Sequence, residues 1–194
     1  MIQFNLDNYE DLIELKIDVT SELFKNLNYN WKKYNPRKDI NRWGCSITSL
    51  DGNDSGIPDI DSLIEYNQLN ETNYKETDFK IPTVHSTPFK SFLSTWDVAR
   101  SHYLKLDSGG FFPWHRDSDK QTFRLIYTIE NCVQGHFIWL HDDTPFKLTD
   151  HKWYFINTKK KHCLFSFNTV IFAVFNVEYT AKNLKLLYDS FVIK

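Results

Sequence analysis

From residue 97 to residue 179 the sequence is a succession of short runs of β-branched, aromatic and other apolar residues. Glycine, proline, asparagine, aspartate and lysine separate one run from the next, a pattern typical of strands joined by turns. The runs cover residues 97–106, 122–130, 135–140, 145–149, 152–157, 162–167 and 169–179. About eight short strands at this spacing predict an antiparallel sandwich or barrel.

The part of the chain before these runs differs from them in composition and in the spacing of its apolar residues. Residues 9–27 carry apolar side chains at helical spacing and acidic residues near their start, and they predict an amphipathic helix. Residues 28–60 are rich in asparagine, aspartate, proline and tryptophan, and 50–62 form an acidic loop with several turn signals. No element is predicted for residues 61–95.

After the runs, residues 180–191 predict a C-terminal helix, because their larger apolar side chains share one face. These side chains are Leu184, Leu187, Tyr188 and Phe191. A length of 194 residues suits a single domain. We therefore expect one mainly β domain with three parts: a helical and loop segment over 1–95, a β-sandwich or jelly-roll core over 97–179 and a helix within 180–194.

Composition and charge exclude several classes of function. The net charge of −2 gives no general basic surface, so nucleic-acid binding is not expected. The longest apolar run, 170–175, is too short to span a bilayer, and the first residues lack the pattern of a secretory signal. Cys45, Cys132 and Cys163 are widely spaced and predict reduced thiols. We expect a soluble, cytoplasmic protein with no membrane partner.

The stretch GGFFPWHRDSD, residues 109–119, holds the first candidate for chemistry. Residues i and i+2 of a strand point to the same side, so His115 and Asp117 can present an imidazole and a carboxylate to one point. A second histidine from a neighbouring strand would complete the 2-His-1-carboxylate set that holds Fe(II) and leaves positions open. The alternative is an ordinary turn into a strand, with a surface ion pair.

His162 is the candidate for the second histidine. It follows the polar turn 157–161 and opens the apolar run 162–167. The separation from Asp117 leaves room for about four strands, which suits a partner that sheet topology brings close. Four further histidines precede the strand region or fall on a hairpin or in polar loops: His85, His136, His141 and His151.

Residues 100–179 resemble the catalytic core of the aspartyl/asparaginyl/prolyl β-hydroxylase family of Fe(II)/2-oxoglutarate dioxygenases. RSHYLKLDSGGFFPWHRD (100–117) resembles that family's approach to its first metal motif, and FRLIYTIEN (123–131) is similar to the strand that follows. KWYFINTKKKHCLFSF (152–167) resembles the tryptophan-containing strand and turn before the distal histidine. The resemblance implies a double-stranded β-helix, which is a cupin-like jelly roll, with Fe(II) and 2-oxoglutarate as cofactors.

Carried over residue by residue, the resemblance implies that His115, Asp117 and His162 bind the iron. It also implies that Arg124 contacts a carboxylate of 2-oxoglutarate, a role that suits the forked geometry of a guanidinium. The alternative for Arg124 is a structural or surface ion pair.

One position departs from the family pattern. The family carries a second arginine shortly after the distal histidine, and this sequence has Phe172 there. Tyr103 and Thr128 are the hydroxyl-bearing residues expected to help Arg124 bind the co-substrate, and Lys105 is a candidate replacement cation.

The predicted function is Fe(II)- and 2-oxoglutarate-dependent hydroxylation of an amino acid, free or within a peptide or protein, with molecular oxygen consumed. Two alternatives stand beside it. One is a cupin-type metalloenzyme that does not use 2-oxoglutarate, consistent with Phe172. The other is a non-catalytic jelly-roll binding module.

Overall fold

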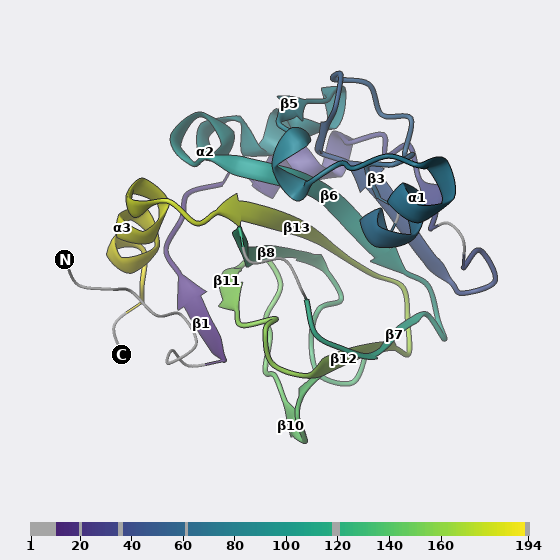
Figure 1. Ribbon diagram of the computed structural model, residues 1–194. Coiled ribbons are helices and arrows are strands. Elements are labelled where there is room, and N and C mark those ends of the chain that lie inside the picture. The colour runs from purple at the N-terminus through teal and green to yellow at the C-terminus, as the bar shows by residue number, and fades with distance from the viewer. Residues whose placement is uncertain (1–10, 20, 35–36, 61, 118–120, 193–194) are drawn as a thin grey trace.

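The computed structural model describes residues 11–19, 21–34, 37–60, 62–117 and 121–192. In this part of the chain two antiparallel sheets face each other (Figure 1). The larger sheet contains, in spatial order, β1 (Leu12–Leu15), β11 (Trp153–Ile156), β8 (Thr122–Glu130), β13 (Val170–Glu178), β6 (Val98–Leu106), β3 (Arg42–Ser46) and β2 (Lys32–Lys33). The smaller sheet contains β10 (Thr144–Pro145), β9 (Phe137–His141), β12 (His162–Ser166) and β7 (Phe111–His115).

The strands from β6 onward pass back and forth between the two sheets. β6, β8, β11 and β13 lie in the larger sheet, and β7, β9, β10 and β12 lie in the smaller one. This is the strand order of a double-stranded β-helix, so the predicted cupin-like jelly roll is confirmed. Of the predicted runs, 145–149 differs most, because β10 covers only Thr144–Pro145.

Strand alternation divides the apolar residues of the larger sheet between two cores. On β13, Phe172 and Val174 face the smaller sheet, and Ala173 and Phe175 face the opposite side. The inner core lies between the sheets and includes Leu104, Ile126, Tyr154 and Trp139. Both faces of the larger sheet are therefore covered, which explains why its central strands are apolar throughout.

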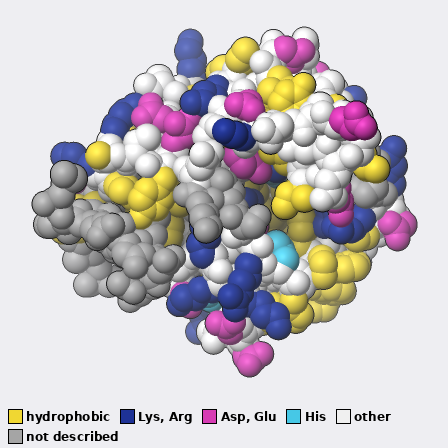
Figure 2. All heavy atoms as spheres, viewed as in Figure 1, with side chains coloured by type: hydrophobic (Ala, Val, Ile, Leu, Met, Phe, Trp, Pro, Cys, Tyr) yellow, Lys and Arg dark blue, Asp and Glu magenta, His cyan; other side chains and the backbone are white. Residues whose placement is uncertain are grey.

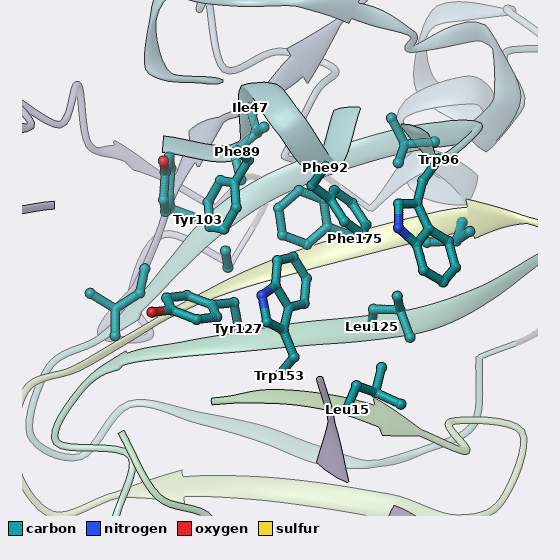
Figure 3. Close-up of a cluster of buried hydrophobic side chains, with 14 of the residues drawn as sticks. Leu15, Ile47, Phe89, Phe92, Trp96, Tyr103, Leu125, Tyr127, Trp153 and Phe175 are labelled. Atoms are coloured by element: carbon teal, nitrogen blue, oxygen red, sulfur yellow. The ribbon is translucent and has the colours of Figure 1, made fainter. Parts of the chain in front are cut away.

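The outer core packs the larger sheet against helical segments, as Figure 3 shows for η4 (Val84–Phe89) and α2 (Lys90–Thr95). The centroids of the Phe89 and Phe175 rings lie 4.7 Å apart, and those of the stacked Phe92 and Trp153 rings lie 4.6 Å apart. Several tilted and edge-to-face aromatic contacts in one place give a core with specific geometry.

The predicted C-terminal helix is present as α3 (Ala181–Asp189). Its Leu187 is buried and its Leu184 packs against the outer core, but Tyr188 is 60% exposed, unlike the expectation that it shared their face. Buried Asn183 fixes the start of the helix: its Nδ2 donates to the carbonyls of Asp97 and Glu178.

The helix predicted over 9–27 is wrong for the described residues in that range. Residues 12–15 form β1, which pairs with β11, and a 3-10 helix, η2 (Ser21–Asn26), follows. Without β1, β11 would be an edge strand with unpaired backbone N–H and C=O groups, and pairing with β1 gives these groups hydrogen-bond partners. The β-branched residues Ile13, Ile17 and Val19 also favour extended backbone over a helix.

Residues 61–95, for which the sequence predicted nothing, contain α1 (Leu63–Asn70) and η3 (Glu76–Asp78) besides η4 and α2. They also contribute β5 (Ile81–Pro82), which pairs with β4 (Thr48–Ser49). In α1 only Leu63 is buried, and Ile64 and Leu69 are exposed. The helix therefore has no apolar face from which its sequence could have predicted it. None of the described helices has the length and apolar character needed to cross a bilayer.

Candidate metal centre

The three residues predicted to bind a metal come together at the edge of the smaller sheet. His115 ends β7, His162 begins β12, and the two are register partners across this antiparallel pair. One ligand atom each from His115, Asp117 and His162 lies within 4.8 Å of the other two. The two imidazole rings have their centroids 4.2 Å apart. Two nitrogens and one carboxylate oxygen at this spacing suit a divalent transition-metal ion.

Asp117 reaches this position although β7 ends two residues earlier. The backbone N–H of Asp117 donates to the carbonyl of Thr158, 2.9 Å away, on the turn before β12. This bond continues the pairing of the two chain segments beyond the regular strand. The side chain therefore stays on the same side as that of His115, as the i, i+2 spacing predicted.

Backbone carbonyls fix the neutral tautomer of both imidazoles. His115 Nδ1 lies 2.7 Å from the carbonyl oxygen of Pro113, and His162 Nδ1 lies 3.0 Å from that of Lys160. A carbonyl oxygen can only accept, so in each neutral ring Nδ1 carries the proton and Nε2 keeps its lone pair. A hydrogen bond from the far nitrogen is the usual support of a metal-binding histidine.

The electrostatics of the site favour the ligating form of its groups. Burial lowers the pKa of His162, and the hydrogen bond to the Lys160 carbonyl raises it by less, so that the pKa is about 4. The ring is therefore neutral at physiological pH. Burial by itself would raise the pKa of Asp117, but the Arg124 guanidinium, the two histidines and a hydrogen bond from Thr158 together outweigh burial, and the pKa is lowered. Asp117 is therefore a carboxylate, ready to bind a cation.

Arg124 lies on β8 with its Nη2 2.7 Å from Asp117 Oδ2. The structural ion pair that stood as its alternative role is thus present. The guanidinium orients the carboxylate from behind, as groups adjacent to a metal ligand commonly do. Arg124 also lines the cavity described next, so contact with a bound ligand is compatible with its position.

A cavity of about 450 Å³ opens at the three residues. The two facing sheets form one wall, with residues such as His102, Trp139, Leu164 and Phe172. Helix α1 and residues 74–76, which lead into η3, form the other wall. Figure 2 shows a hollow on this face with a histidine side chain visible in it, and lysine and arginine side chains gathered below it. The sequence pattern gave no indication that residues 62–76 would form a cavity wall.

The hydroxyl-bearing residues expected to help bind a co-substrate lie elsewhere. Tyr103 is on the outer face of β6, where its hydroxyl donates to the carbonyl of His85. Thr128 Oγ1 donates to the carbonyls of Thr149 and Lys152. Neither lines the cavity, and Lys105 lies over the Trp31 and Trp43 rings. The side chains that alternate with Tyr103 and Lys105 are the ones that face inward.

The polar residues that do line the cavity were mostly missed. His102 was not considered, and Glu76 lay in the segment with no predicted element. Arg100 forms a bidentate pair with Glu76, with bonds of 2.7 and 2.8 Å, and Asn176 Nδ2 also donates to Glu76. An ion pair is what the position of Arg100 at the start of a strand favours in the sequence. The inward positions of β6, which follow from the alternation of side chains along a strand, were the signal that could have indicated His102.

His141 lies next to the site but is engaged by other groups. It is a register partner of His162 on β9. Its Nδ1 contacts Asp11 Oδ2 at 2.9 Å, and its Nε2 contacts the carbonyl of Asn157 at 3.1 Å. His162, and not this neighbouring histidine, therefore joins His115 and Asp117.

No protein-family model matches this sequence, and no curated protein matches it. Solved structures do resemble it. An oxidoreductase of the 2OG-Fe(II) oxygenase family from Burkholderia pseudomallei aligns with 78% of this chain and 72% of its own, at 12% identity and a TM-score of 0.44.

A cupin domain from Bordetella pertussis aligns with 41% of this chain and 80% of its own, at 16% identity and a TM-score of 0.33. A predicted oxalate decarboxylase from Thermotoga maritima aligns with 46% of this chain and 73% of its own, at 11% identity and a TM-score of 0.33. Because every one of these TM-scores is below 0.5, the fold assignment depends on the strand order of the molecule itself.

Proposed function

We propose that this protein is an Fe(II)- and 2-oxoglutarate-dependent oxygenase whose metal ligands are His115, Asp117 and His162. The observation that carries the proposal is the convergence of these three side chains, with the Nδ1 atom of each imidazole on a backbone carbonyl and the carboxylate ionised. Three protein ligands on one side of a metal leave positions for a co-substrate and oxygen. Bound iron would supply the activation of oxygen, which no amino-acid side chain can perform.

The residues of the chain would hold and shield the reacting groups. Arg124 orients Asp117, and the inner-core rings of Trp139 and Phe112 pack against the His162 and His115 rings, at centroid distances of 5.9 and 6.0 Å. These apolar surfaces exclude water from one side of the centre, which protects reactive species and strengthens local electrostatic interactions.

The proposed substrate is an amino acid, free or within a peptide or protein, that enters from the open side of the cavity between α1 and the smaller sheet. One atom of molecular oxygen would go to the substrate C–H bond and the other to succinate, with release of carbon dioxide. We expect neither nucleic acid nor a membrane as partner, and we expect a cytoplasmic location, consistent with three free thiols.

The test measures succinate formed from 2-oxoglutarate by protein loaded with Fe(II) in air. Many oxygenases of this kind turn over slowly without their main substrate, so wild type is expected to form succinate and His162→Ala is not. In the absence of oxygen, 2-oxoglutarate should add a weak visible absorption band to the Fe(II) protein. Iron binding without that band would exclude 2-oxoglutarate as a chelating ligand.

Phe172 favours a second candidate, a cupin-type metalloenzyme with the same three ligands and no 2-oxoglutarate. Its ring lines the cavity and is 1% exposed, so this position of β13 offers no cation to a carboxylate. The same experiment separates the candidates, because this enzyme would bind Fe(II) and give neither the band nor succinate.

A further inference from the structure

The cavity contains two buried nitrogens without a hydrogen-bond partner among the described residues. They are Nε1 of Trp139 on β9 and Nδ1 of His102 on β6. Both side chains line the cavity, and they are only 4% and 5% exposed. Buried polar atoms are nearly always paired, so two unpaired ones on one cavity wall indicate a ligand that pairs with them. We call these two residues the polar pair.

The polar pair flanks Phe172. The Trp139 and Phe172 rings lie 6.0 Å apart across the two sheets. Within the larger sheet, Phe172 is opposite Leu104 on β6, and Val174, the next inward residue of β13, is opposite His102. Phe172 thus supplies an apolar surface next to the polar pair.

Both nitrogens can act as donors. An indole Nε1–H can only donate. In His102 the Tyr34 hydroxyl lies 2.8 Å from Nε2, and when that hydroxyl donates, the neutral ring carries its proton on Nδ1. The ligand they fit must therefore present acceptor atoms.

Two neutral N–H donors favour an anionic acceptor. Burial, and then the nearby Arg100 and Arg124, lower the pKa of His102 well below its usual value, so the ring is neutral. Hydrogen bonds from neutral N–H groups to a carboxylate are about twice as strong as those between neutral partners. A carboxylate here would gain both hydrogen bonds.

We propose that the polar pair binds the second carboxylate of 2-oxoglutarate, with Trp139 Nε1 and His102 Nδ1 donating to it beside Phe172. This inference rests on the proposed function, because it assigns the far end of the same co-substrate. Trp139 stacks on His162, so a short ligand held at the metal by its 2-oxo acid end lies next to this wall. In this proposal two neutral N–H groups bind the carboxylate in place of a guanidinium.

The experiment compares 2-oxoglutarate with 2-oxobutanoate, which has the same 2-oxo acid end and no second carboxylate. Calorimetric titration of the Mn(II)-loaded protein measures binding without turnover. Wild type is expected to prefer 2-oxoglutarate. Trp139→Phe, which keeps the ring and removes the donor, should weaken 2-oxoglutarate binding about tenfold or more. It should leave 2-oxobutanoate binding nearly unchanged, and His102→Leu should act in the same way.

Trp153→Phe is the matched control. Trp153 is also buried and its Nε1 also lacks a partner among the described residues, but it belongs to the outer core and does not line the cavity. It should leave both affinities unchanged. Mn(II) affinity, measured first for every variant, shows that each one is folded at the metal centre.

Two results would overturn the inference, and they can be told apart. If wild type prefers 2-oxoglutarate and the preference survives in both Trp139→Phe and His102→Leu, the polar pair does not bind the carboxylate, and the proposed function stands. If Mn(II)-loaded wild type binds neither 2-oxo acid, the proposed function fails and this assignment fails with it.

Discussion

At the scale of single residues, the metal centre depends on details that spacing does not reveal. The carbonyls of Pro113 and Lys160 fix which nitrogen of His115 and of His162 is free, and each carbonyl lies two residues before its histidine. The sequence gives the residue types and their order. The bonds arise from the local turn of the backbone, which is visible only in the folded chain.

Burial of neutral His162 makes the stability of the metal-free protein depend on pH. Its pKa falls from 6.5 to about 4 on folding, so between these values the unfolded chain binds more protons than the folded one. The free energy of unfolding should therefore decrease as pH falls through this window, by up to about 1.4 kcal/mol per pH unit for this residue. His102, whose pKa is also lowered by burial, acts in the same direction. Urea unfolding of metal-free protein from pH 7 to pH 4.5 measures the effect.

His162→Gln tests the assignment of that pH dependence. The variant has one group fewer to protonate, so its unfolding free energy should change less steeply with pH than that of wild type. Equal slopes for the two proteins would show that His162 is not neutral and buried in the metal-free state.

Strand parity explains which site residues the sequence could identify. His115 and Asp117 were identified because period two puts them on one side. Tyr103 was chosen for its hydroxyl, yet it alternates with the inward residues His102 and Leu104 and belongs to the outer core. Applying the same parity to β6 would have favoured His102. Trp139 resembles any core tryptophan in sequence, and only the structure shows that its indole N–H lacks a partner.

At the scale of elements, the strands from β6 onward could be predicted, but the five described strands before them and the cavity wall from α1 to η3 could not. The β runs are bounded by turn residues and were located to within a few positions, apart from β10. α1 buries one side chain, and η3 is three residues long, so neither has a periodic pattern. A buried ion pair holds this wall in place. Arg100 of β6 and Asn176 of β13 both bind the Glu76 carboxylate.

Loss of the Glu76 carboxylate should therefore destabilise the molecule strongly. The side chains of Arg100 and Glu76 are 10% and 16% exposed, so Glu76→Ala leaves a buried guanidinium without this carboxylate. Removing one member of a buried pair typically costs about 3–5 kcal/mol of unfolding free energy. Denaturant unfolding at pH 7 measures this change.

Glu22→Ala is the control for that measurement. Glu22 also forms an ion pair, with Lys25, but both side chains are 74% exposed and water screens their interaction. No measurable change is expected. If the two variants have equal stability, the Glu76–Arg100 pair does not hold the cavity wall.

At the scale of the whole molecule, a jelly roll carries helices on one outer face and a cavity on the inside. The number and spacing of the runs predicted an antiparallel sandwich or barrel, and the family resemblance implied the double-stranded β-helix. The N-terminal segment was wrongly predicted as a helix because its pattern was read in isolation. Its conformation depends on the edge of β11, a partner about 140 residues away in sequence that no local pattern reveals.

The same arrangement explains how the three ligands become neighbours. β7 and β12 are distant in the chain, but the jelly-roll order makes them adjacent in the smaller sheet, with His115 opposite His162. The outer core holds the larger sheet rigid behind them, through rings such as Phe89 and Trp153 (Figure 3). A metal site supported by two packed sheets is pre-organised before any ion binds.

Anaerobic calorimetric titration with Fe(II) tests the central claim most directly. Wild type is expected to bind one equivalent. His162→Ala and Asp117→Ala should each lose this binding, and His151→Ala, which changes an exposed histidine away from the cavity, should retain it. Fe(II) bound equally well by wild type and by His162→Ala would contradict the assignment of the metal centre.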